Sequence, residues 1–185
     1  RSSTSFIMRI AYGGPPGAFG ELACLARFPE GEPVGYADFP AACAALVGGD
    51  CDHALIPFEN SIAGPVPGVV DLLASLPVRR IGEHAQPVAF HCLGVPGTRL
   101  DEGQVIASHP MALAECTRFL ARTGARAVEA GDTAGAAATV AEEGDRTHAA
   151  LASERAATLY GLEVIAANVE DSPDNVTHFA VLERA

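Results

Sequence analysis

The sequence predicts an α/β fold in two lobes, and three of its features indicate this. Segments typical of strands and of helices alternate along the 185 residues, a pattern that favours parallel βαβ units with helices on both faces of a sheet. Hydrophobic residues make up 49% of the chain, enough for a sizeable core and too many for a disordered protein. Two segments rich in Gly, Pro or polar residues, 94–103 and 170–175, interrupt the alternation and are expected to be crossings between the lobes.

The two crossings divide the chain. Lobe 1 is expected to comprise residues 8–93 and 175–185, and lobe 2 residues 94–174. Met8 is expected to be the natural start, with residues 1–7 lying before the domain. Open α/β sheets bind ligands outside the carboxyl ends of their strands, so the site is expected in a cleft at the crossings.

The strands are predicted from short apolar runs that are bounded by Gly, Pro or charged residues. His53–Phe58 is such a run, and alternation in the last strand sends Thr177 and Phe179 to one face and His178 to the other. In chain order, the expected strands cover residues 8–12, 34–37, 53–58, 78–82, 87–93, 105–107, 125–128, 148–152, 164–166 and 177–182.

The helices are predicted from apolar residues, many of them Ala, at helical spacing. Pro110 suits the first turn of a helix, and Asp132 is expected to cap the Ala-rich helix that follows it. Residues 59–67 are expected to be irregular. In chain order, the expected helices cover residues 18–28, 40–47, 69–75, 110–122, 133–142 and 154–159.

Charge and composition exclude several classes of function. The formal net charge is −11 and the sequence contains no Lys, which rules out a Schiff base formed by this chain. Such an acidic surface repels phosphate backbones, so nucleic acid is not an expected partner. The apolar runs are too short to span a membrane, and the first residues lack the apolar core of a secretory signal. Any anionic substrate must therefore be held by local hydrogen-bond donors.

The five cysteines are odd in number and scattered, with no CxxC pair. They are expected to be buried thiols in a reducing compartment, so a cytoplasmic location is predicted. No Cys/His cluster has the spacing of metal ligands, and no metal is expected.

The Gly- and Pro-containing loop at residues 13–17 joins a strand to a helix, where free N–H groups can hold an anion. A dinucleotide site is one interpretation, because Asp38 follows the next strand. The glycines do not have the GxGxxG spacing, however, and Pro15 and Pro16 remove N–H donors. A tight turn is the favoured interpretation.

Polar residues follow several of the predicted strands. Glu59-Asn60-Ser61 follows an apolar strand, Ser108-His109-Pro110 enters a helix, and Asn175 precedes the last strand. Each set has a structural interpretation as a cap or turn and a functional one as a group of ligand-binding side chains.

The order of these motifs resembles the prephenate dehydratase family over about residues 10–182. The resemblance rests on six segments, Gly14-Pro15-Pro16-Gly17-Ala18-Phe19, Pro57-Phe58-Glu59-Asn60-Ser61-Ile62, Ser108-His109-Pro110 with Ala112-Leu113-Ala114, Asp132-Thr133-Ala134-Gly135-Ala136-Ala137, Leu159-Tyr160-Gly161-Leu162 and Asp174-Asn175-Val176-Thr177-His178-Phe179.

The resemblance implies a fold like that of type 2 periplasmic binding proteins, with the active site in the interlobe cleft. It implies a lyase that converts prephenate to phenylpyruvate in phenylalanine biosynthesis, without a cofactor because aromatisation drives the reaction. Catalytic roles are implied for Thr177, Glu59 and Asn60. Substrate-binding roles are implied for Ser61, Ser108, His109, Met111, Thr133, Asn175, His178 and Phe179.

Four positions depart from the family's usual residues. His178 stands where Arg is usual, Met111 where Gln is usual, and Gly20 and Pro65 where Ser is usual. Loss of a donor to a substrate carboxylate costs about 1.5–3 kcal/mol, so weakened binding is expected. Three alternatives therefore stay open: an arogenate dehydratase, a non-aromatising prephenate decarboxylase, and a non-catalytic module that binds a small acid.

The family also implies a homodimer or homotetramer that acts on a small molecule. Family members often carry a C-terminal ACT domain that binds phenylalanine, and no such domain is expected within these residues. Residues 1–185 are therefore expected to show no allosteric inhibition by phenylalanine.

Overall fold

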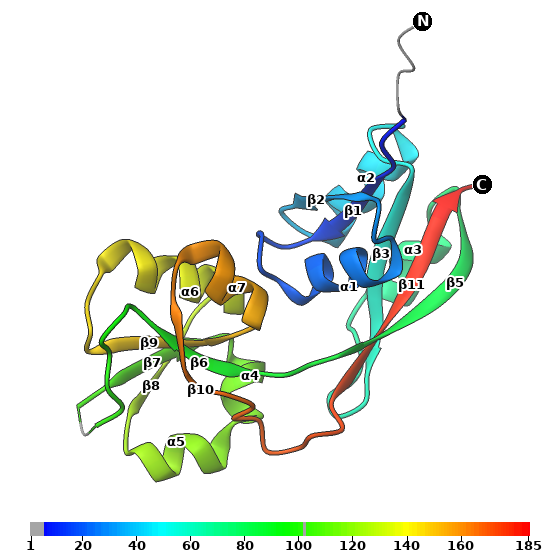
Figure 1. Cartoon of the computed structure of the whole chain (residues 1–185). Coiled ribbons are helices and arrows are strands. Elements are labelled where there is room, and N and C mark those ends of the chain that lie inside the picture. The colour runs from blue at the N-terminus through cyan, green and yellow to red at the C-terminus, as the bar shows by residue number, and fades with distance from the viewer. Residues whose placement is uncertain (1–5, 102) are drawn as a thin grey trace, which may run out of the picture. The chain divides into compact units, whose positions relative to one another are not determined.

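The computed structural model describes residues 6–101 and 103–185, which form two compact units (Figure 1). Unit 1 contains residues 6–14, Phe19–Pro87 and Val176–Ala185. Unit 2 contains Pro15–Ala18 and Val88–Asn175. Of the segment expected before the natural start, residues 1–5 lie outside the described residues, as does residue 102 within the expected first crossing.

Unit 1 is built on a six-stranded mixed sheet of order β2-β1-β3-β11-β5, with the short β4 paired to β3. Its strands are β1 (Arg9–Gly13), β2 (Glu32–Tyr36), β3 (His53–Asn60), β4 (Gly64–Pro65), β5 (Val78–Pro87) and β11 (Val176–Arg184). The first three long strands are parallel, as the βαβ pattern predicts. β11 runs antiparallel between β3 and β5, which makes the sheet mixed.

Three helices accompany this sheet: α1 (Phe19–Arg27), α2 (Phe39–Val47) and α3 (Val69–Ala74). The core cluster combines residues of α2 with one face of the sheet, including Ala11, Ile56 and Leu182, all of which are buried. α2 starts sharply because the Asp38 carboxylate accepts a hydrogen bond of 2.8 Å from the Ala41 N–H.

Unit 2 has a five-stranded sheet of order β10-β6-β9-β7-β8. Its strands are β6 (His91–Gly94), β7 (Val105–Ser108), β8 (Arg126–Glu129), β9 (His148–Ala152) and β10 (Glu163–Ala166). β7 is parallel to β8 and β9, whereas β6 runs antiparallel to β9 and β10. This sheet is mixed as well.

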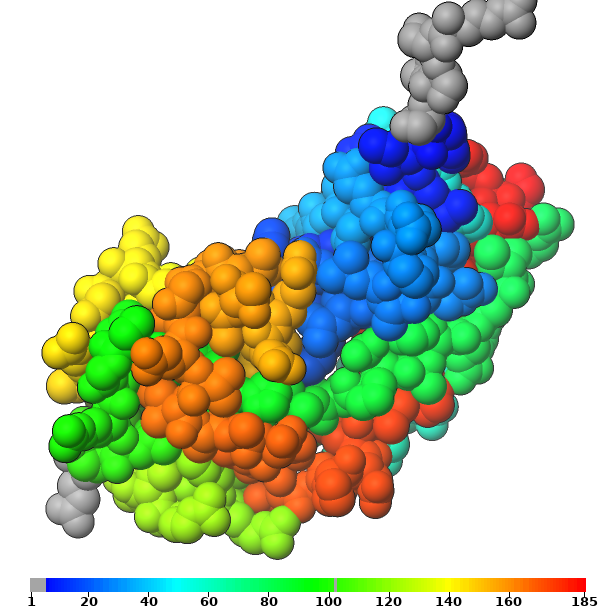
Figure 2. All heavy atoms as spheres, viewed as in Figure 1, coloured from blue at the N-terminus to red at the C-terminus, as the bar shows by residue number. Residues whose placement is uncertain are grey.

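The helices of unit 2 are α4 (Pro110–Ala114), α5 (Thr117–Thr123), α6 (Thr133–Glu143) and α7 (Glu154–Tyr160). Small side chains let α6 and α7 lie close to the sheet, and the buried Ala137, Ala150 and Ala156 share one core cluster. The view in Figure 2 shows α5 and α7 on the surface of this unit.

The structure departs from the expected elements at three places. β3 continues through Glu59 and Asn60, which pair with β11 and β4, so this start of the expected irregular segment is strand. Residues 78–87 form one continuous strand, and the next begins at His91. The helix expected over 110–122 is broken at Glu115 and Cys116 into α4 and α5.

The boundary between the units also differs from the expected one. Residues 88–93 belong to unit 2 because β6 pairs with β9 and β10 of that unit. Asn175 belongs there too, whereas it was expected in lobe 1. The loop Pro15–Ala18, expected in lobe 1, packs on α7 of unit 2: Ser153 Oγ donates to the Gly17 carbonyl and the Tyr160 hydroxyl donates to the Pro16 carbonyl, each at 2.6 Å.

Candidate functional site

The start of β11 places Thr177 between two amide-bearing neighbours. In the sheet, Thr177 pairs with Asn60 of β3 on one side and with Gln86 of β5 on the other. Thr177 and Asn60 are half-buried, and Gln86 is buried. Cross-strand neighbours share a face of a sheet, so the three polar side chains form one cluster in unit 1.

The side chain of Asn60 has a fixed orientation. Its Oδ1 accepts hydrogen bonds of 2.9 Å from the backbone N–H groups of Ile62 and Ala63. The amide nitrogen therefore faces the other way, and Nδ2 donates to the Thr177 hydroxyl oxygen at 3.0 Å and to the Val176 carbonyl at 3.3 Å. The Thr177 hydroxyl accepts from Asn60, which leaves its own proton to be donated elsewhere.

The residues on either side of Asn60 differ in role. The Ser61 hydroxyl accepts a hydrogen bond of 2.9 Å from the Val176 N–H, and the Ser61 N–H donates to the Val176 carbonyl at the same distance. Ser61 thus anchors the residue that precedes Thr177. Glu59 is exposed at the end of β3.

His178 lies on the face of β11 opposite Thr177. Its Nδ1 is 2.8 Å from a carboxylate oxygen of Glu83, which also forms an ion pair of 2.7 Å with Arg80. The guanidinium of Arg80 lies 4.4 Å from the centre of the Phe58 ring, and the Phe58 and His178 rings are 6.2 Å apart. The structure therefore gives His178 partners within unit 1 and does not bring it together with Thr177.

Phe179 is only 3% exposed and belongs to the core of unit 1. Its cross-strand neighbour is His84, whose Nε2 lies 3.0 Å from the side-chain oxygen of Gln86. Gln86, a member of the Thr177 cluster, and His84 beside it are therefore polar residues of the site that were not predicted from the sequence. The alternation of polar and apolar residues over His84-Ala85-Gln86 was the available signal, because it indicates a strand with one polar face.

In unit 2, the Ser-His-Pro motif joins β7 to α4. Ser108 is fully buried, and its hydroxyl donates to the Leu151 carbonyl of β9 at 2.7 Å. The half-buried His109 accepts a hydrogen bond of 3.0 Å at Nδ1 from the Met111 N–H and so caps α4. The Met111 side chain is 49% exposed and is available for contact with a ligand.

Asn175 is 2% exposed, and its Nδ2 donates to a carboxylate oxygen of Glu115 at 2.7 Å. Glu115 follows the last residue of α4, so this bond links the helix of the Ser-His-Pro motif to the segment before β11. Burial raises the pKa of the Glu115 carboxyl, and the hydrogen bond from Asn175 opposes that rise. Glu115 was not predicted from the sequence, because a Glu in the pattern of an exposed helix gives no sign of burial.

Thr133 is half-buried at the first position of α6. The preceding residue caps this helix as predicted, because the Asp132 carboxylate accepts a hydrogen bond from the Gly135 N–H. A methyl group on Gly135 would come within 2.8 Å of that carboxylate, so the close approach requires Gly at this position.

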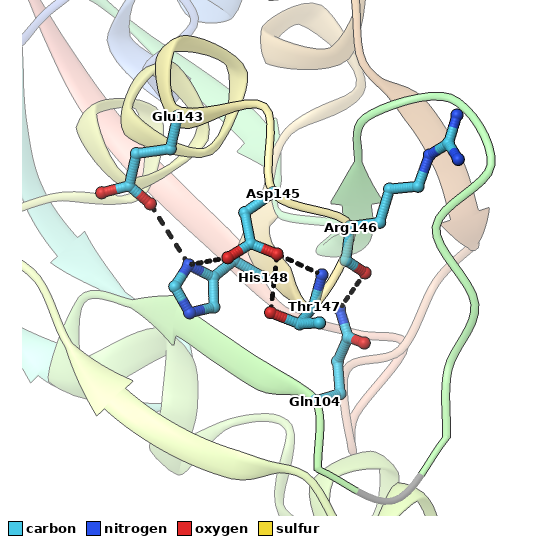
Figure 3. Close-up of polar contacts among 6 residues, drawn as sticks. All are labelled: Gln104, Glu143, Asp145, Arg146, Thr147 and His148. Atoms are coloured by element: carbon cyan, nitrogen blue, oxygen red, sulfur yellow. Dashed lines mark hydrogen bonds and ion pairs between the residues drawn. The ribbon is translucent and has the colours of Figure 1, made fainter.

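A cavity of about 410 Å³ lies along α6 in unit 2, and it contains none of the predicted site residues. Glu129, Asp132 and Glu143 line it, together with His148, whose Nδ1 is 3.2 Å from Glu143 (Figure 3). Three carboxylates repel an anion, so this cavity does not suit an acidic ligand. Across the described residues, no group of three or more His, Cys, Asp or Glu side chains is placed to hold a metal ion.

Comparison with known proteins identifies the family of this arrangement. The family model described as prephenate dehydratase matches residues 10–185. An Arabidopsis thaliana protein named arogenate dehydratase/prephenate dehydratase 1, chloroplastic, is 40% identical over 177 residues, which cover 96% of this chain and 45% of that protein. A Komagataeibacter europaeus protein named bifunctional N-acyl-homoserine lactone acylase/prephenate dehydratase is 38% identical over 95% of this chain and 62% of its own length.

Solved structures agree with the sequence comparison. The prephenate dehydratase of Arthrobacter aurescens in complex with L-Phe superposes with a TM-score of 0.88 at 28% identity, covering 96% of this chain and 61% of that one. A periplasmic substrate-binding protein of an ABC transporter from Coxiella burnetii, 14% identical, has a TM-score of 0.51 over 96% of this chain and 84% of its own, and shows the likeness of fold alone. The predicted α/β fold of the periplasmic-binding-protein type is confirmed. The chain spans about half to two thirds of the length of the relatives it matches.

Proposed function

Because the chain belongs to the prephenate dehydratase family, we propose that it converts prephenate to phenylpyruvate by decarboxylation and loss of the ring hydroxyl. In this reaction the bond between the ring and its carboxylate breaks and releases CO2. The electron pair of that bond enters the ring, the ring becomes aromatic, and the opposite carbon releases its hydroxyl as hydroxide. The energy of aromatisation makes a cofactor unnecessary, so the enzyme has to orient the substrate and assist the leaving group.

The observation that carries the proposal is the direction of the hydrogen bond between Asn60 and Thr177. Asn60 donates to the Thr177 oxygen at 3.0 Å, so the Thr177 proton is directed away from Asn60. A hydroxyl that donates a hydrogen bond to the departing oxygen stabilises the negative charge that develops there. A neutral Thr is too weak an acid for full proton transfer, so hydrogen bonding is its proposed role.

The other predicted site residues fall into two groups, those that are exposed or half-buried and those that are buried or bonded within the protein. Glu59, exposed beside Asn60, is proposed as a further catalytic group, and Ser61, His109, Met111 and Thr133 as substrate contacts. Ser108, Asn175 and Phe179 are buried, and His178 is bonded to Glu83. For these four residues the proposed role is support of the site, in place of the substrate contact expected from the sequence.

The substrate carboxylates need donors that compensate for the departures at Met111 and His178. α6 is the longest helix of unit 2; in its first turn Asp132 holds the Gly135 N–H, and the N–H groups of Thr133 and Ala134 are left for another acceptor. We therefore assign one substrate carboxylate to the start of α6.

The test is a direct assay in which purified protein is incubated with prephenate and phenylpyruvate is followed by its absorbance in alkali. Wild-type turnover is expected, and Thr177→Val should lower kcat by about 10²–10³, the usual cost of one such donor, while substrate binding and Tm change little. Thr177→Ser keeps a hydroxyl and is the matched control. Turnover by Thr177→Val at the wild-type rate would overturn the role of the hydroxyl, and no turnover by wild type would overturn the function.

Arogenate is the second candidate substrate, because the Arabidopsis thaliana relative bears the name of both dehydratases. Arogenate carries an ammonium group where prephenate has a keto group, so its product is phenylalanine. Comparing kcat/KM for the two substrates distinguishes them. A ratio above about tenfold, equivalent to 1.4 kcal/mol, assigns the specificity.

The proposed setting of the enzyme is a reducing compartment such as the cytoplasm. All five cysteines are free and buried, and burial raises the pKa of the Cys24, Cys92 and Cys116 thiols to about 12. No helix among the described residues is long and apolar enough to cross a membrane. A homodimer or homotetramer is the proposed assembly, and light scattering on the eluted protein tests it.

A further inference from the structure

The side-chain amide of Gln86 has an orientation that its hydrogen bonds fix. Its oxygen lies 3.0 Å from Nε2 of His84, and its nitrogen donates to the Pro87 carbonyl at 3.3 Å. A carbonyl can only accept, so the nitrogen end of the amide must face Pro87 and the oxygen end must face His84. His84 therefore donates to Gln86 from Nε2.

One N–H group of this amide is left over. The amide nitrogen carries two protons, and the bond to Pro87 uses one of them. The other proton has no acceptor among the residues that the structure describes. Gln86 is only 8% exposed, so bulk water has little access to this group. An unpaired buried N–H is unfavourable in the free protein, and an acceptor atom of a bound ligand would satisfy it.

The leftover donor lies on the same face of the sheet as Thr177. Gln86 and Thr177 are directly opposite each other on β5 and β11, and side chains at such paired positions are neighbours on one face. The Thr177 oxygen already accepts from Asn60 at 3.0 Å, so the Thr177 proton is directed away from Asn60. Thr177 is half-buried, which leaves the cluster open to a ligand. Two uncommitted donors, the Thr177 O–H and the Gln86 N–H, therefore lie side by side.

From this geometry we propose that Gln86 is a second hydrogen-bond donor to the departing hydroxyl of the substrate, an inference that rests on the proposed dehydratase function. The bond between the ring carbon and this oxygen breaks, and the oxygen leaves with the electron pair as hydroxide, while the Gln86 proton stays on its nitrogen. Two preorganised donors stabilise the charge that develops on that oxygen better than one. His84 is a positioning residue, because its bond to the amide oxygen holds the nitrogen end in place.

The test is steady-state kinetics of prephenate turnover for Gln86→Leu and His84→Leu, alone and combined. Gln86→Leu removes the donor at similar side-chain size, and it should lower kcat by about 10²-fold with less than about a threefold change in KM, as expected for a contact made in the transition state. His84→Leu should lower kcat several-fold on its own. Beside Gln86→Leu it should have no further effect on kcat, because His84 acts through the amide.

Gln86→Glu is a second variant at the same position. Its carboxylate still accepts from His84 but offers no N–H group, so kcat should fall at least as far as in Gln86→Leu. The two variants differ in polarity and charge and share only the loss of the donor. A common fall in kcat therefore reports the donor and not the packing of one side chain.

Gln104→Leu is the matched control, because Gln104 is a second buried amide, 2% exposed, and lies in unit 2. Its nitrogen donates to the Arg146 carbonyl at 3.4 Å, so the variant loses a buried hydrogen bond away from Thr177. Tm should fall, while kcat stays within about twofold of wild type, because lower stability alone does not change the transition state of the folded enzyme.

The outcomes separate this inference from the proposed function. If wild type forms phenylpyruvate and either Gln86 variant keeps the wild-type kcat, or loses only KM, the role of Gln86 is wrong and the dehydratase function stands. An equal loss of kcat in Gln104→Leu would also contradict that role, and equal losses from His84→Leu in both backgrounds would contradict positioning through the amide. If wild type forms no phenylpyruvate, the function is wrong and the role of Gln86 falls with it.

Discussion

Asn60 holds two backbone N–H groups through its side-chain oxygen and the Thr177 hydroxyl through its nitrogen. A suitable substitution of Asn60 can therefore reverse the direction of its hydrogen bond with the Thr177 hydroxyl without removing that bond. In Asn60→Asp, one carboxylate oxygen keeps the backbone contacts and the other accepts the Thr177 proton. The hydroxyl is then no longer free to donate to the leaving group.

Asn60→Asp should lower kcat for prephenate by about 10²-fold or more, the cost of one transition-state donor, while Tm falls by only a few degrees. Asn168→Asp is the control for added charge, because Asn168 is exposed and lies in unit 2. Steady-state kinetics and thermal unfolding of both variants give the answer. A kcat near that of wild type for Asn60→Asp would mean that the bond direction is irrelevant.

His178 gives a second prediction for a single side chain. It lies 2.8 Å from Glu83 on the face opposite Thr177, so an Arg at this position should form a bidentate pair with that carboxylate. His178→Arg should therefore change kcat/KM by less than about twofold. The pH profiles of variant and wild type from pH 5.5 to 8.5 should run parallel.

Glu83→Gln distinguishes a structural role of His178 from a role in substrate binding, because it removes the carboxylate that His178 contacts and leaves the imidazole in place. A clear gain in kcat/KM from His178→Arg, with loss of pH dependence, would show that this side chain reaches the substrate after all. That result would restore the interpretation drawn from the family motif.

The candidate site shows how far residues can be identified from sequence. Asn60 and Thr177, far apart in the chain, were singled out through the family motif, and the structure joins them by a hydrogen bond. Burial was not predictable in the same way. Ser108 and Asn175 were expected to bind the ligand. In the structure the Ser108 hydroxyl donates to the Leu151 carbonyl and the Asn175 amide donates to the Glu115 carboxylate, both within unit 2. A motif identifies a residue type, whereas the solvent exposure of that residue depends on how distant segments of the chain pack around it.

At the scale of elements, two carboxylates lie at the junction of α4 and α5: Glu115, which is buried, and Asp171, which caps α5. The Asp171 carboxylate accepts from the Thr117 and Arg118 N–H groups and so caps α5. Burial favours a raised pKa for Asp171, but these bonds and the Thr117 hydroxyl outweigh it and lower that pKa. Glu115 has the opposite balance, because burial outweighs its bond from Asn175 and raises its pKa.

The raised pKa of Glu115 makes its effect on stability depend on pH. The folded state holds this proton more tightly than the unfolded chain, in which the carboxyl titrates near its ordinary value of 4.5. Its stabilising contribution is therefore fully present below that pH and is lost as pH rises through the higher folded-state pKa. At neutral pH the buried charge destabilises the fold.

Glu115→Gln should therefore raise Tm at pH 7–8, by about 2–4 °C for each kcal/mol of unfavourable charge burial that it removes. The amide oxygen still accepts from Asn175, and the difference from wild type should vanish near pH 4. Thermal unfolding across this range, with Glu163→Gln as an exposed control, measures the effect. A Tm difference that grows as pH falls would contradict the sign of the pKa shift.

The sequence predicts elements better than it predicts their pairing. Regular spacing of apolar residues located α2, α6 and α7 within a few residues, because each begins at a side-chain cap, Asp38, Asp132 or Ser153. The break at Glu115 and Cys116 was missed because both residues fit a continuous helix, and the segment 170–175 that ends α4 and caps α5 comes much later in the chain. The antiparallel pairing of β6 with β9 and β10, and of β11 with β3 and β5, was missed as well, since alternation of elements carries no information on strand direction.

At the scale of the whole molecule, the net charge of −11 opposes the approach of a dianionic substrate. The chain has 12 Arg and no Lys against 23 acidic residues, so repulsion acts over distances comparable to the Debye length. That length falls from about 30 Å at 0.01 M salt to about 8 Å at 0.15 M. Salt should therefore weaken the repulsion before it weakens the short-range hydrogen bonds that hold the bound substrate.

Raising NaCl from 10 mM to 150 mM should increase kcat/KM for prephenate several-fold through a lower KM, with little change in kcat, because screening acts on association and not on the leaving group. Arogenate carries one positive charge more than prephenate, so its KM should respond less and serves as the internal comparison. Sucrose at equal osmolality controls for effects on protein stability. A fall in kcat/KM with salt would mean that cationic groups near the site dominate the long-range field, and the carboxylates would then have to be assigned to Arg side chains in place of the N–H groups at the start of α6.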